Sequence, residues 1–511
     1  MGSQTPGGRY HLRNGTCLIS GEKGCLVLQI APLRAIRVNP AAMRVLKRCQ
    51  TGFSLHEAAD DAHRTAVLSL CDTMYEAGVL DWEPPDDVFE PLVSIVVPVY
   101  NRAHEIGSCL ESLLHLDYPA WRREIIVVDD ASRDHTVSVV RGYDVRLIIQ
   151  PKNMGQSAAR NAGVQAAKGE IVAFIDSDCT ADPNWLRELL PYFHDPRLAL
   201  VGGYVDTPRG TSRLDLYEAA HSPLNMGTKR VIGKGEDSVF YVPTCNMLLR
   251  KEMYIQTGGL DERLRVGEDV DFCWKLMSMG HRLMYTPEGR VKHKHRNRLL
   301  ENFKRRFDYG TSEAVLYDRY RQITKRFPWH WDGILLLLLW VTGLMVRSVP
   351  LLLVGLVYLI VEPVYKRMRF NRQFGITLPL NKFFSATGKR HLMLAFHFGH
   401  HLTRYYLMAA MVLAIFVPQL ALPLLALTIL PAVVVFFRKK PDLGFPVFLL
   451  FFWLEQAFYQ SGVFWGCLKQ GSFRLYRVSL APAGRSHPAI TRAASPLGPK
   501  KTAFSKETAP S

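Results

Sequence analysis

The chain has 511 residues, of which 48% are hydrophobic and 21% charged, and its formal net charge is +17 at pH 7. This length exceeds one ordinary domain, so two or three structural units are expected. The positive charge would allow nucleic-acid binding, but the absence of zinc-finger spacing and of an RNA-motif aromatic signature argues against that class. Nine scattered cysteines without a C-x-x-C pair argue against a disulfide framework.

Residues 1–85 are expected to form a small module of the winged-helix type, with two strand-like runs, YHLRNG and CLVLQI, before three helices. Asn39 precedes Pro40 as a helix N-cap, and Ser54 and Glu57 have capping-box spacing. The segment His56–His63 carries three acidic residues and therefore lacks the basic recognition helix of a DNA-binding protein. We expect this module to bind a protein or peptide. No apolar signal core opens the chain, so its soluble part is expected in the cytoplasm.

A proline-rich acidic linker, residues 86–92, leads into alternating strand and helix patterns over residues 93–327. Buried β-branched runs such as VSIVVPVY, REIIVVDD and EIVAFIDSD alternate with helical segments such as EIGSCLESLLHL and GQSAARNAGVQAAKG. This order predicts an α/β fold with a mostly parallel sheet.

Apolar runs dominate residues 328–470, which predicts a C-terminal membrane domain of roughly four segments. The first two runs are short and flank Arg347, so each is either a tilted span or half of a re-entrant hairpin. Basic clusters such as Lys366–Arg372 fit cytoplasmic loops of a protein in the cell membrane. The basic tail, residues 471–511, is rich in Ala, Pro, Ser and Lys and is expected to be disordered.

Polar residues follow three strands of the predicted sheet: Tyr100 and Asn101, then Asp129 and Asp130, then Asp176 and Asp178. Ligands of open α/β sheets bind beyond the carboxyl ends of strands. One such pair alone often only starts a turn, but three strand ends together indicate a site. The Asp-x-Asp pair suits Mg²⁺ or Mn²⁺ bound with phosphate oxygens.

Two other nucleotide motifs are excluded. No G-x-G-x-x-G follows the first strand, which argues against a dinucleotide site. The segment GTKRVIGKGE has the wrong glycine spacing for a P-loop, and Gly235 follows Lys234 where that loop needs Ser or Thr.

The segments VSIVVPVYN, EIIVVDDAS, NMGQSAARNAG, GEIVAFIDSD and GGLDERLRVGEDVDFCWKL resemble, in order and spacing, the family-2 glycosyltransferases with the GT-A fold. The resemblance covers about Val93 to His295 and implies inverting transfer from a nucleotide-diphosphate sugar. It places the donor nucleotide near Pro98, Tyr100, Asn101, Asp129, Asp130, Arg160 and Asp176.

The same resemblance implies that Asp176 and Asp178 hold the metal and diphosphate and that Asp269 is the general base. His293 would be a third metal or diphosphate contact, although a surface histidine in a basic loop is an equal alternative. Glu268 and Asp271 could equally be acids that only favour a helix N-terminus. The resemblance also implies that the segment CNMLLRK contacts the acceptor and that Arg305 or Arg306 contacts the diphosphate.

The N-terminal segment IRVNPAAMRVLKRCQTGFSLHEAADD resembles the PqqD-like modules, which bind precursor peptides of modified ribosomal peptides by strand addition. This module, a family-2 domain and C-terminal apolar helices together are similar to the glycosyltransferases of mycofactocin systems. That similarity implies a peptide-derived redox cofactor or its precursor as the acceptor, and UDP-glucose as donor of a β-linked oligoglucose chain.

Two alternatives stay open. A polysaccharide synthase of the same family would extrude its product, but the chain has no Gln-x-x-Arg-Trp sequence to hold a polymer, and its apolar runs are few for a channel. A membrane-tethered peptide-binding adaptor with a dead transferase domain would not need Asp176, Asp178 and Asp269.

Overall fold

The computed structural model of the chain describes residues 7–21, 24–30, 33–58, 60–208, 210–235, 238–294 and 298–482. His295 and the tail from residue 483 onward therefore lie outside the described residues. The chain divides into two compact units. Of the described residues, the first unit comprises those up to Glu83 together with Pro363–Ala386, and the second comprises Pro84–Glu362 and those from Thr387 to Pro482.

The first unit contains two small antiparallel sheets, ordered β2-β3-β4 and β5-β1-β6. Its elements are β1 (Arg9–Leu12), β2 (Thr16–Gly21), β3 (Gly24–Ile30), β4 (Leu33–Val38), α1 (Pro40–Arg48), β5 (Phe53–Ser54), η1 (Leu55–Glu57), α2 (Asp61–Glu76) and β6 (Leu80–Glu83).

The predicted caps of this unit are present, but the element count differs. The Asn39 side chain accepts from the Ala42 N–H at 2.7 Å, and Ser54 and Glu57 form a capping box. Four strands rather than two precede α1, and two α-helices form instead of three. The predicted middle helix is a single 3-10 turn because Asp60 accepts from the His63 N–H and starts a new helix there.

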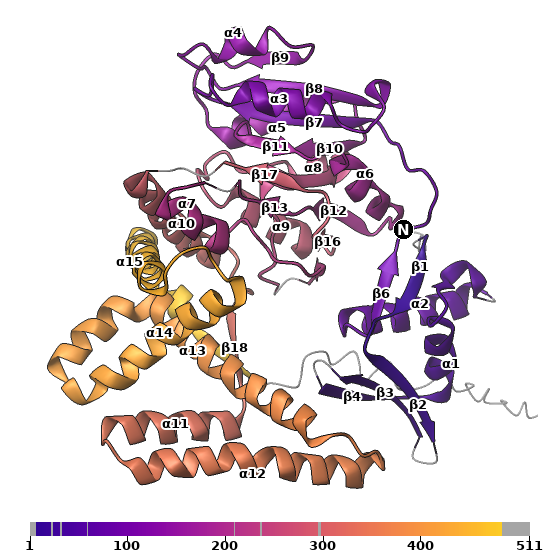
Figure 1. Cartoon of the computed structure of the whole chain (residues 1–511). Helices are drawn as coiled ribbons and strands as arrows, with labels where there is room; N and C mark the ends of the chain where they lie inside the picture. Colours follow the sequence, from indigo (N-terminus) through magenta and orange to yellow (C-terminus); the bar gives the residue numbers. More distant parts are fainter. Residues whose placement is uncertain are drawn as a thin grey trace, which may run out of the picture. The chain divides into compact units, whose positions relative to one another are not determined.

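The second unit is organised by an eight-stranded sheet of order β14-β16-β12-β15-β10-β7-β8-β9 (Figure 1). β7 pairs in parallel with β8 and β10, and β15 is antiparallel to both of its neighbours. The predicted α/β fold with a mostly parallel sheet is confirmed. The strands are β7 (Val93–Val99), β8 (Arg123–Asp129), β9 (Arg146–Ile149), β10 (Ile171–Phe174), β12 (Leu198–Gly202), β14 (Val231–Gly233), β15 (Met247–Arg250) and β16 (Arg282–Tyr285).

A second sheet of three short strands, β11-β17-β13, lies beside the end of β10. It consists of β11 (Cys179–Ala181), β13 (Val205–Asp206) and β17 (Val291–His293). The helices of this part are α3 (Ile106–Leu114), η2 (Ala120–Arg122), α4 (Thr136–Val140), α5 (Gln156–Ala166), α6 (Trp185–Leu189), η3 (Leu190–His194), α7 (Arg213–His221), η4 (Thr244–Asn246), α8 (Lys251–Thr257), α9 (Glu268–Ser278) and α10 (Leu299–Arg319).

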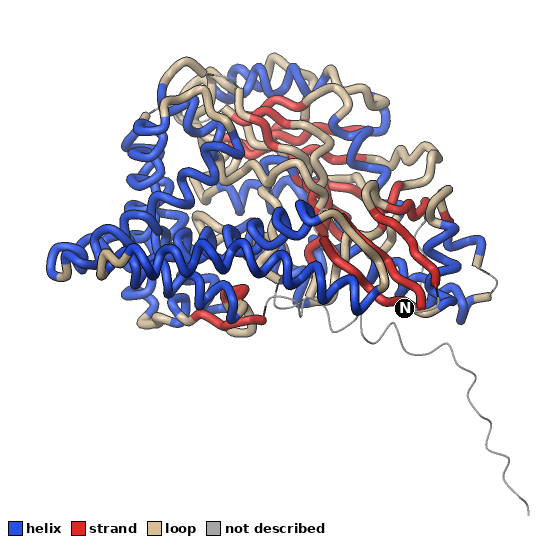
Figure 2. Tube along the Cα trace, turned by 60° about the horizontal axis from the view of Figure 1, so that its bottom comes forward, coloured by secondary structure: helices blue, strands red, loops and turns tan. Residues whose placement is uncertain are grey.

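The core of the large sheet explains its strand order. Val96, Ile126, Val172 and Phe174 are fully buried, as expected for parallel strands covered on both faces. Figure 2 shows the strands in red among the blue helices. Helix α5 lies on β7 and β8, and Gly163 lets it approach closely, because a Cβ there would overlap Val96. The approach places the N-terminus of α5 next to the carboxyl ends of the strands.

Long helices follow the sheet. They are α11 (Trp331–Met345), α12 (Val349–Phe374), α13 (Leu380–Phe416), η5 (Pro418–Leu420), α14 (Ala421–Lys439) and α15 (Phe445–Gln470), with η6 (Arg474–Tyr476) and the parallel pair β18 (Lys325–Trp329) and β19 (Val478–Pro482). Within the described ranges, three helical segments are long and apolar enough to cross a membrane: Val349–Phe374, Pro418–Lys439 and Phe445–Gln470. These segments indicate membrane association.

Candidate active site

A cavity of about 360 Å³ opens at the carboxyl ends of β7, β8 and β10. Most of the residues predicted from the sequence line it: Pro98, Tyr100, Asp130, Arg160, Asp176, Asp178, Asp269 and His293. Asn101 and Asp129 do not line it. Residues that lie up to 195 positions apart in the sequence are therefore brought together at one edge of the sheet.

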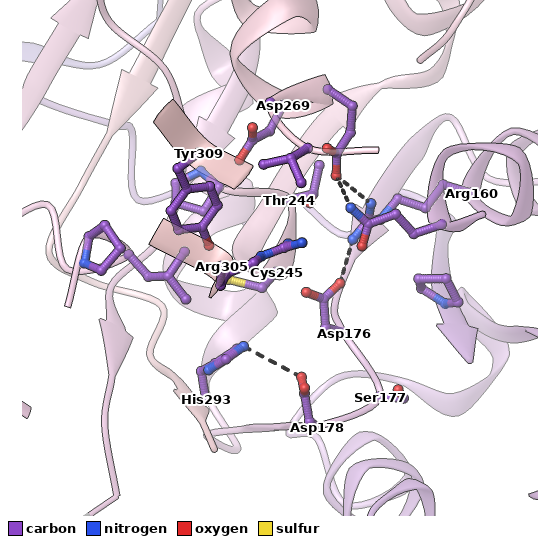
Figure 3. Close-up of a pocket in the computed structure, with 18 of the residues that line it drawn as sticks. Arg160, Asp176, Ser177, Asp178, Thr244, Cys245, Asp269, His293, Arg305 and Tyr309 are labelled. Carbon is purple, nitrogen blue, oxygen red and sulfur yellow. Dashed lines mark hydrogen bonds and ion pairs between the residues drawn. The ribbon is translucent and has the colours of Figure 1, made fainter. Parts of the chain in front are cut away.

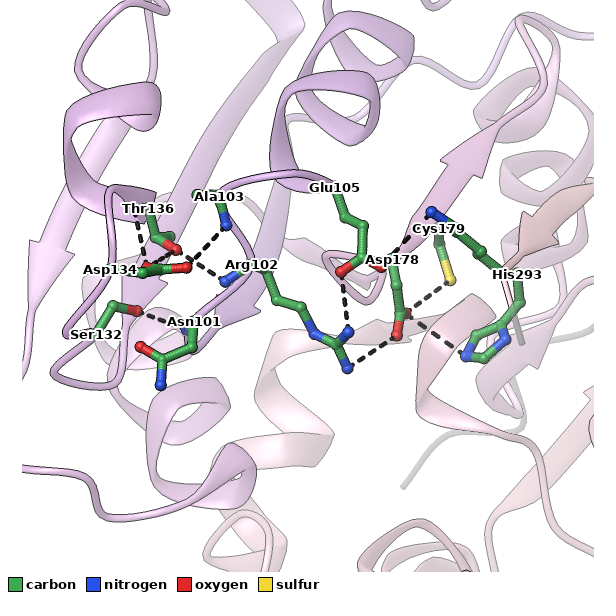
Figure 4. Close-up of polar contacts among 11 residues, drawn as sticks. Asn101, Arg102, Ala103, Glu105, Ser132, Asp134, Thr136, Asp178, Cys179 and His293 are labelled. Atoms are coloured by element: carbon green, nitrogen blue, oxygen red, sulfur yellow. Dashed lines mark hydrogen bonds and ion pairs between the residues drawn. The ribbon is translucent and has the colours of Figure 1, made fainter. Parts of the chain in front are cut away.

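Asp176 and Asp178 lie at the end of β10, on the segment that leads into β11. β11 pairs with β17 so that Cys179 is opposite His293. This register brings the Nε2 atom of His293 to 3.5 Å from a carboxylate oxygen of Asp178 (Figures 3 and 4). One ligand atom each from Asp178, Cys179 and His293 lie within 4.8 Å of one another.

Arg102, which the sequence analysis did not single out, is also part of this group. Its guanidinium lies 3.6 Å from Asp178 and 2.9 Å from Glu105 (Figure 4). Burial opposes the charge of Arg102, but the carboxylates of Asp178 and Glu105 outweigh it and raise its pKa. The only sequence signal for Arg102 was its place two residues after Tyr100, beyond the end of β7.

Arg160 joins the two acidic parts of the cavity. Its side chain is almost fully buried, and its guanidinium lies 2.6 Å from Asp176 and 3.1 Å from Glu268. The Gln156 side chain also donates to Glu268, at 2.6 Å. Burial alone would lower the pKa of Arg160, but the two carboxylates raise it, so the guanidinium stays charged.

Asp269 lies in the first turn of α9, after Gly267, whose φ of 82° suits glycine. Its carboxylate faces the cavity (Figure 3). Burial, and then the neighbouring Glu268 carboxylate, raise the pKa of Asp269 to about 7. A carboxyl group with this pKa can accept a proton near neutral pH.

The other two acids of this turn have structural partners. Glu268 binds Arg160, as described above. Asp271 lies 2.6 Å from Arg319 and accepts a hydrogen bond from the Tyr320 hydroxyl at 3.0 Å, so it anchors the end of α10. Asp269 therefore differs from the other two acids. Its carboxylate faces the cavity, and no guanidinium of the described residues lies within ion-pair distance of it.

The acids after β8 hold loops in place. Asp130 accepts from the Met154 and Gly155 N–H groups at 2.7 and 2.8 Å and thereby fixes the start of α5. One oxygen of Asp129 accepts from the Ser132 N–H at 2.9 Å. Its other oxygen, Oδ1, is buried and has no hydrogen-bond partner among the described residues. Asn101, with a φ of 52°, accepts from the Arg133 N–H at 2.8 Å.

The far side of the cavity is formed by α7 and α10. Arg306 is buried and forms ion pairs with two carboxylates, at 2.7 Å from Glu218 of α7 and 3.6 Å from Glu455 of α15. Arg305 also lines the cavity, and no carboxylate lies within ion-pair distance of it among the described residues (Figure 3). The Arg305 guanidinium lies 5.1 Å from the centroid of the Tyr309 ring, so Arg305, rather than Arg306, is the arginine whose charge can meet an anionic ligand.

The segment CNMLLRK has divided roles. Cys245 lines the cavity. Asn246 is fully buried, accepts from the Trp185 indole N–H at 2.8 Å and donates to the Gly289 carbonyl at 2.8 Å. Asn246 therefore holds the sheet edge together, and only the start of this segment faces the cavity.

The class of protein follows from comparison with known families. Residues 94–258 match the family described as glycosyl transferase family 2. This part of the chain, which carries β7, β8, β10 and both acidic strand ends, is a family-2 glycosyltransferase domain.

Among curated proteins, the chain is 34% identical over 301 residues to the pre-mycofactocin glycosyltransferase of Mycobacterium tuberculosis, covering 58% of this chain and 61% of that relative. It is 31% identical to the glycosyltransferase AglE of Haloferax volcanii, covering 38% of this chain and 64% of that relative. Succinoglycan biosynthesis protein ExoO of Rhizobium meliloti is 31% identical over 40% of this chain and 61% of its own length. The chain is thus related to glycosyltransferases of the mycofactocin system and of polysaccharide biosynthesis, and it spans about 61% of the first of these relatives.

The two neighbouring arginines of α10 should separate binding from stability. We expect Arg306→Met to lower the stability of the fold by about 3–5 kcal/mol, because Glu218 and Glu455 would stay buried without their cation. Arg305→Met should leave the melting temperature near that of the unchanged protein and weaken the binding of an anionic donor. Thermal unfolding and donor titration of the two variants check this. Equal loss of stability in both would contradict the assignment.

Proposed function

We propose that the chain is a membrane-associated inverting glycosyltransferase that moves a sugar from a nucleotide diphosphate onto a peptide-derived acceptor of the mycofactocin type. The observation that carries this proposal is the cavity, where the acids of the β10 end and Asp269 of α9 face one space at the edge of a family-2 domain.

The residues supply the groups that an inverting displacement needs. An acceptor hydroxyl oxygen attacks the anomeric carbon of the sugar while Asp269 takes the hydroxyl proton. The bond from that carbon to the diphosphate oxygen breaks, and the nucleotide diphosphate leaves. Arg305 lies on the cavity wall where it can bind the departing diphosphate, whose charge grows as the bond breaks.

The donor set of the β10 end fits a hard divalent cation, Mg²⁺ or Mn²⁺. Asp176, Asp178 and His293 offer carboxylate oxygens and an imidazole nitrogen. A further group within reach, the Cys179 thiol, is a soft ligand and does not suit such a hard ion. When bound, the cation would supply Lewis-acid neutralisation of the diphosphate.

We propose UDP-glucose as the donor, on the resemblance of the strand-end segments around Tyr100, Asp129 and Asp130 to family-2 glycosyltransferases. Asp129 is fully buried and does not line the cavity, so the loop after β8 would have to open before its unpartnered Oδ1 met a nucleobase.

The acceptor class rests on the relation to the pre-mycofactocin glycosyltransferase. The first unit offers two strand edges for peptide binding. β2 and β4 are the edge strands of its three-stranded sheet, and an extended peptide can pair with either of them. We propose that this PqqD-like module, residues 1–85, recognises the acceptor or its precursor peptide. Residues 86–92 link it to residues 93–327, which catalyse transfer. Residues 328–470 contact the membrane.

A polysaccharide synthase is the second candidate, and the relation to ExoO favours it. Against it, the sequence has no Gln-x-x-Arg-Trp segment to hold a growing polymer.

One experiment tests the proposed reaction. Purified full-length protein is incubated with UDP- and GDP-sugars, Mg²⁺ or Mn²⁺, and either a peptide-derived acceptor or a glycan primer, and products are read by mass spectrometry. Transfer of single hexoses to the peptide-derived acceptor is the expected result. Elongation of the glycan primer alone would favour the polysaccharide synthase, and no transfer to any acceptor would remove the proposal.

The pH profile should report the base. Because the pKa of Asp269 is raised to about 7, its carboxylate gains the charge needed to accept a proton only as the pH rises through that value. We expect kcat/KM to climb with pH and level off above about 8. Asp269→Asn should retain donor binding and lose transfer by at least about 100-fold. A flat profile, or transfer by the Asn variant at the unchanged rate, would reassign the base.

Removal of the cation should stop turnover. We expect EDTA to abolish transfer and Mn²⁺ to restore it, and Asp178→Asn to raise the Mn²⁺ concentration needed for half-maximal activity by about tenfold or more. Asp182→Asn, which changes an acid directly after β11 and outside the cavity, is the control and should behave as the unchanged protein. Full activity in EDTA would contradict the cation role.

A further inference from the structure

Helix α11 and the first half of α12 form an antiparallel hairpin. The turn between them contains Arg347, whose φ of 52° is left-handed, and the Ser348 N–H donates to the Gly343 carbonyl at 2.8 Å. A Cβ at Gly343 would lie 2.8 Å from Leu352, and one at Gly355 would overlap Trp340. These close approaches fix the register of the two helices along the hairpin.

Continuing that register pairs outward positions of the two helices. Leu335 lies at the level of Ile360, Leu338 at that of Val357, and Val346 beside Val349. All six side chains are more than half exposed. Between Gly333 and Val361 the only charged residue is Arg347 at the turn. An apolar surface this continuous needs a cover other than water.

The open end of the hairpin is closed by a polar cluster. Arg390 of α13 lies 2.7 and 2.8 Å from the two oxygens of Asp332, and His391 lies 2.6 Å from Glu362. Asp332, Glu362 and His391 have the donor set of a metal site, but Arg390 already occupies both oxygens of Asp332. The cluster therefore marks the polar base from which both helices of the hairpin extend.

The hairpin is too short to cross a bilayer twice. From Gly333 to Val346 is about 14 residues, or about 21 Å at helical rise, whereas the hydrocarbon layer is about 30 Å thick. A tip at this depth passes the midplane, and the long side chain of Arg347 can extend toward the far headgroups.

We propose that residues 333–361 form a re-entrant hairpin that enters the acyl layer of the membrane from the side of the Asp332–Glu362 cluster and returns to it. This inference rests on the membrane association in the proposed function and makes α12 a returning helix, although its length alone would suit a span. A crossing α12 would place Glu362 halfway along the span, where a charged group is strongly disfavoured. The basic residues of Lys366–Arg372 follow Glu362, as expected for an end that stays at the headgroups.

Depth measurements test the hairpin. In a background with Cys17 and Cys25 replaced by serine, a single cysteine is placed at one position of each pair in turn: Leu335, Ile360, Leu338, Val357, Val346 or Val349. Each cysteine carries a fluorophore. The proteins are inserted in phosphatidylcholine vesicles whose lipids are brominated at shallow or deep acyl positions. The six positions point outward, so the labels leave the packing intact. A label at Val88, which is 80% exposed in the linker, is the unquenched control.

We expect equal depth within each pair and stronger quenching by deep bromines at Val349 than at Ile360. A crossing α12 gives the reverse order, with Ile360 near the bilayer centre and Val349 at the headgroups, and would overturn the proposal. Labels that no lipid quenches would overturn it as well. Fluorescence quenching does not depend on turnover, so this test is independent of the proposed function. A protein without transferase activity can still show the hairpin, and an active transferase can still lack it.

Discussion

The buried guanidinium of Arg160 is the contact on which the site depends. It joins Asp176, at the end of β10, to Glu268, at the start of α9. A cation enclosed by protein is stable only with such partners, because burial of an unpaired charge costs several kcal/mol. The same contact fixes the distance between the Asp-x-Asp segment and Asp269, which follows Glu268, so the two acidic ends of the cavity are held by one side chain.

A second buried cluster ties an apolar helix to the cavity. Gly310 of α10 and Gly462 and Gly466 of α15 let the two helices meet along their backbones. Next to this contact, Arg306 lies between Glu218 and Glu455. Since Arg305 is the next residue on α10, the packing of a membrane-type helix sets the position of a cavity side chain. Helix α15 therefore supports the α10 wall of the cavity, although no described residue of α15 lines it.

Sequence patterns predicted the sheet and its acidic edge because both depend on local order. β-branched runs give buried parallel strands, and carboxyl ends of such strands meet at one edge whatever the loops between them. Tyr100, Asp130, Asp176 and Asp178 were thus assigned to one cavity from the strand ends alone, whereas Pro98 came from the family resemblance. The patterns failed where two local signals compete, as at Ser54–Glu57, where a capping box opens only a 3-10 turn because Asp60 starts the next helix.

The sequence by itself determined the fold class, the strand ends that carry polar groups and the apolar character of the C-terminal helices. Only the tertiary structure decided which residue of each pair has an oppositely charged partner among the described residues: Asp271 rather than Asp269, and Arg306 rather than Arg305. The register of β11 on β17 likewise decided that His293 meets Asp178. Adjacent residues of like charge are equivalent in a sequence, and their roles diverge only when distant helices and strands supply a partner to one and leave the other open to the cavity.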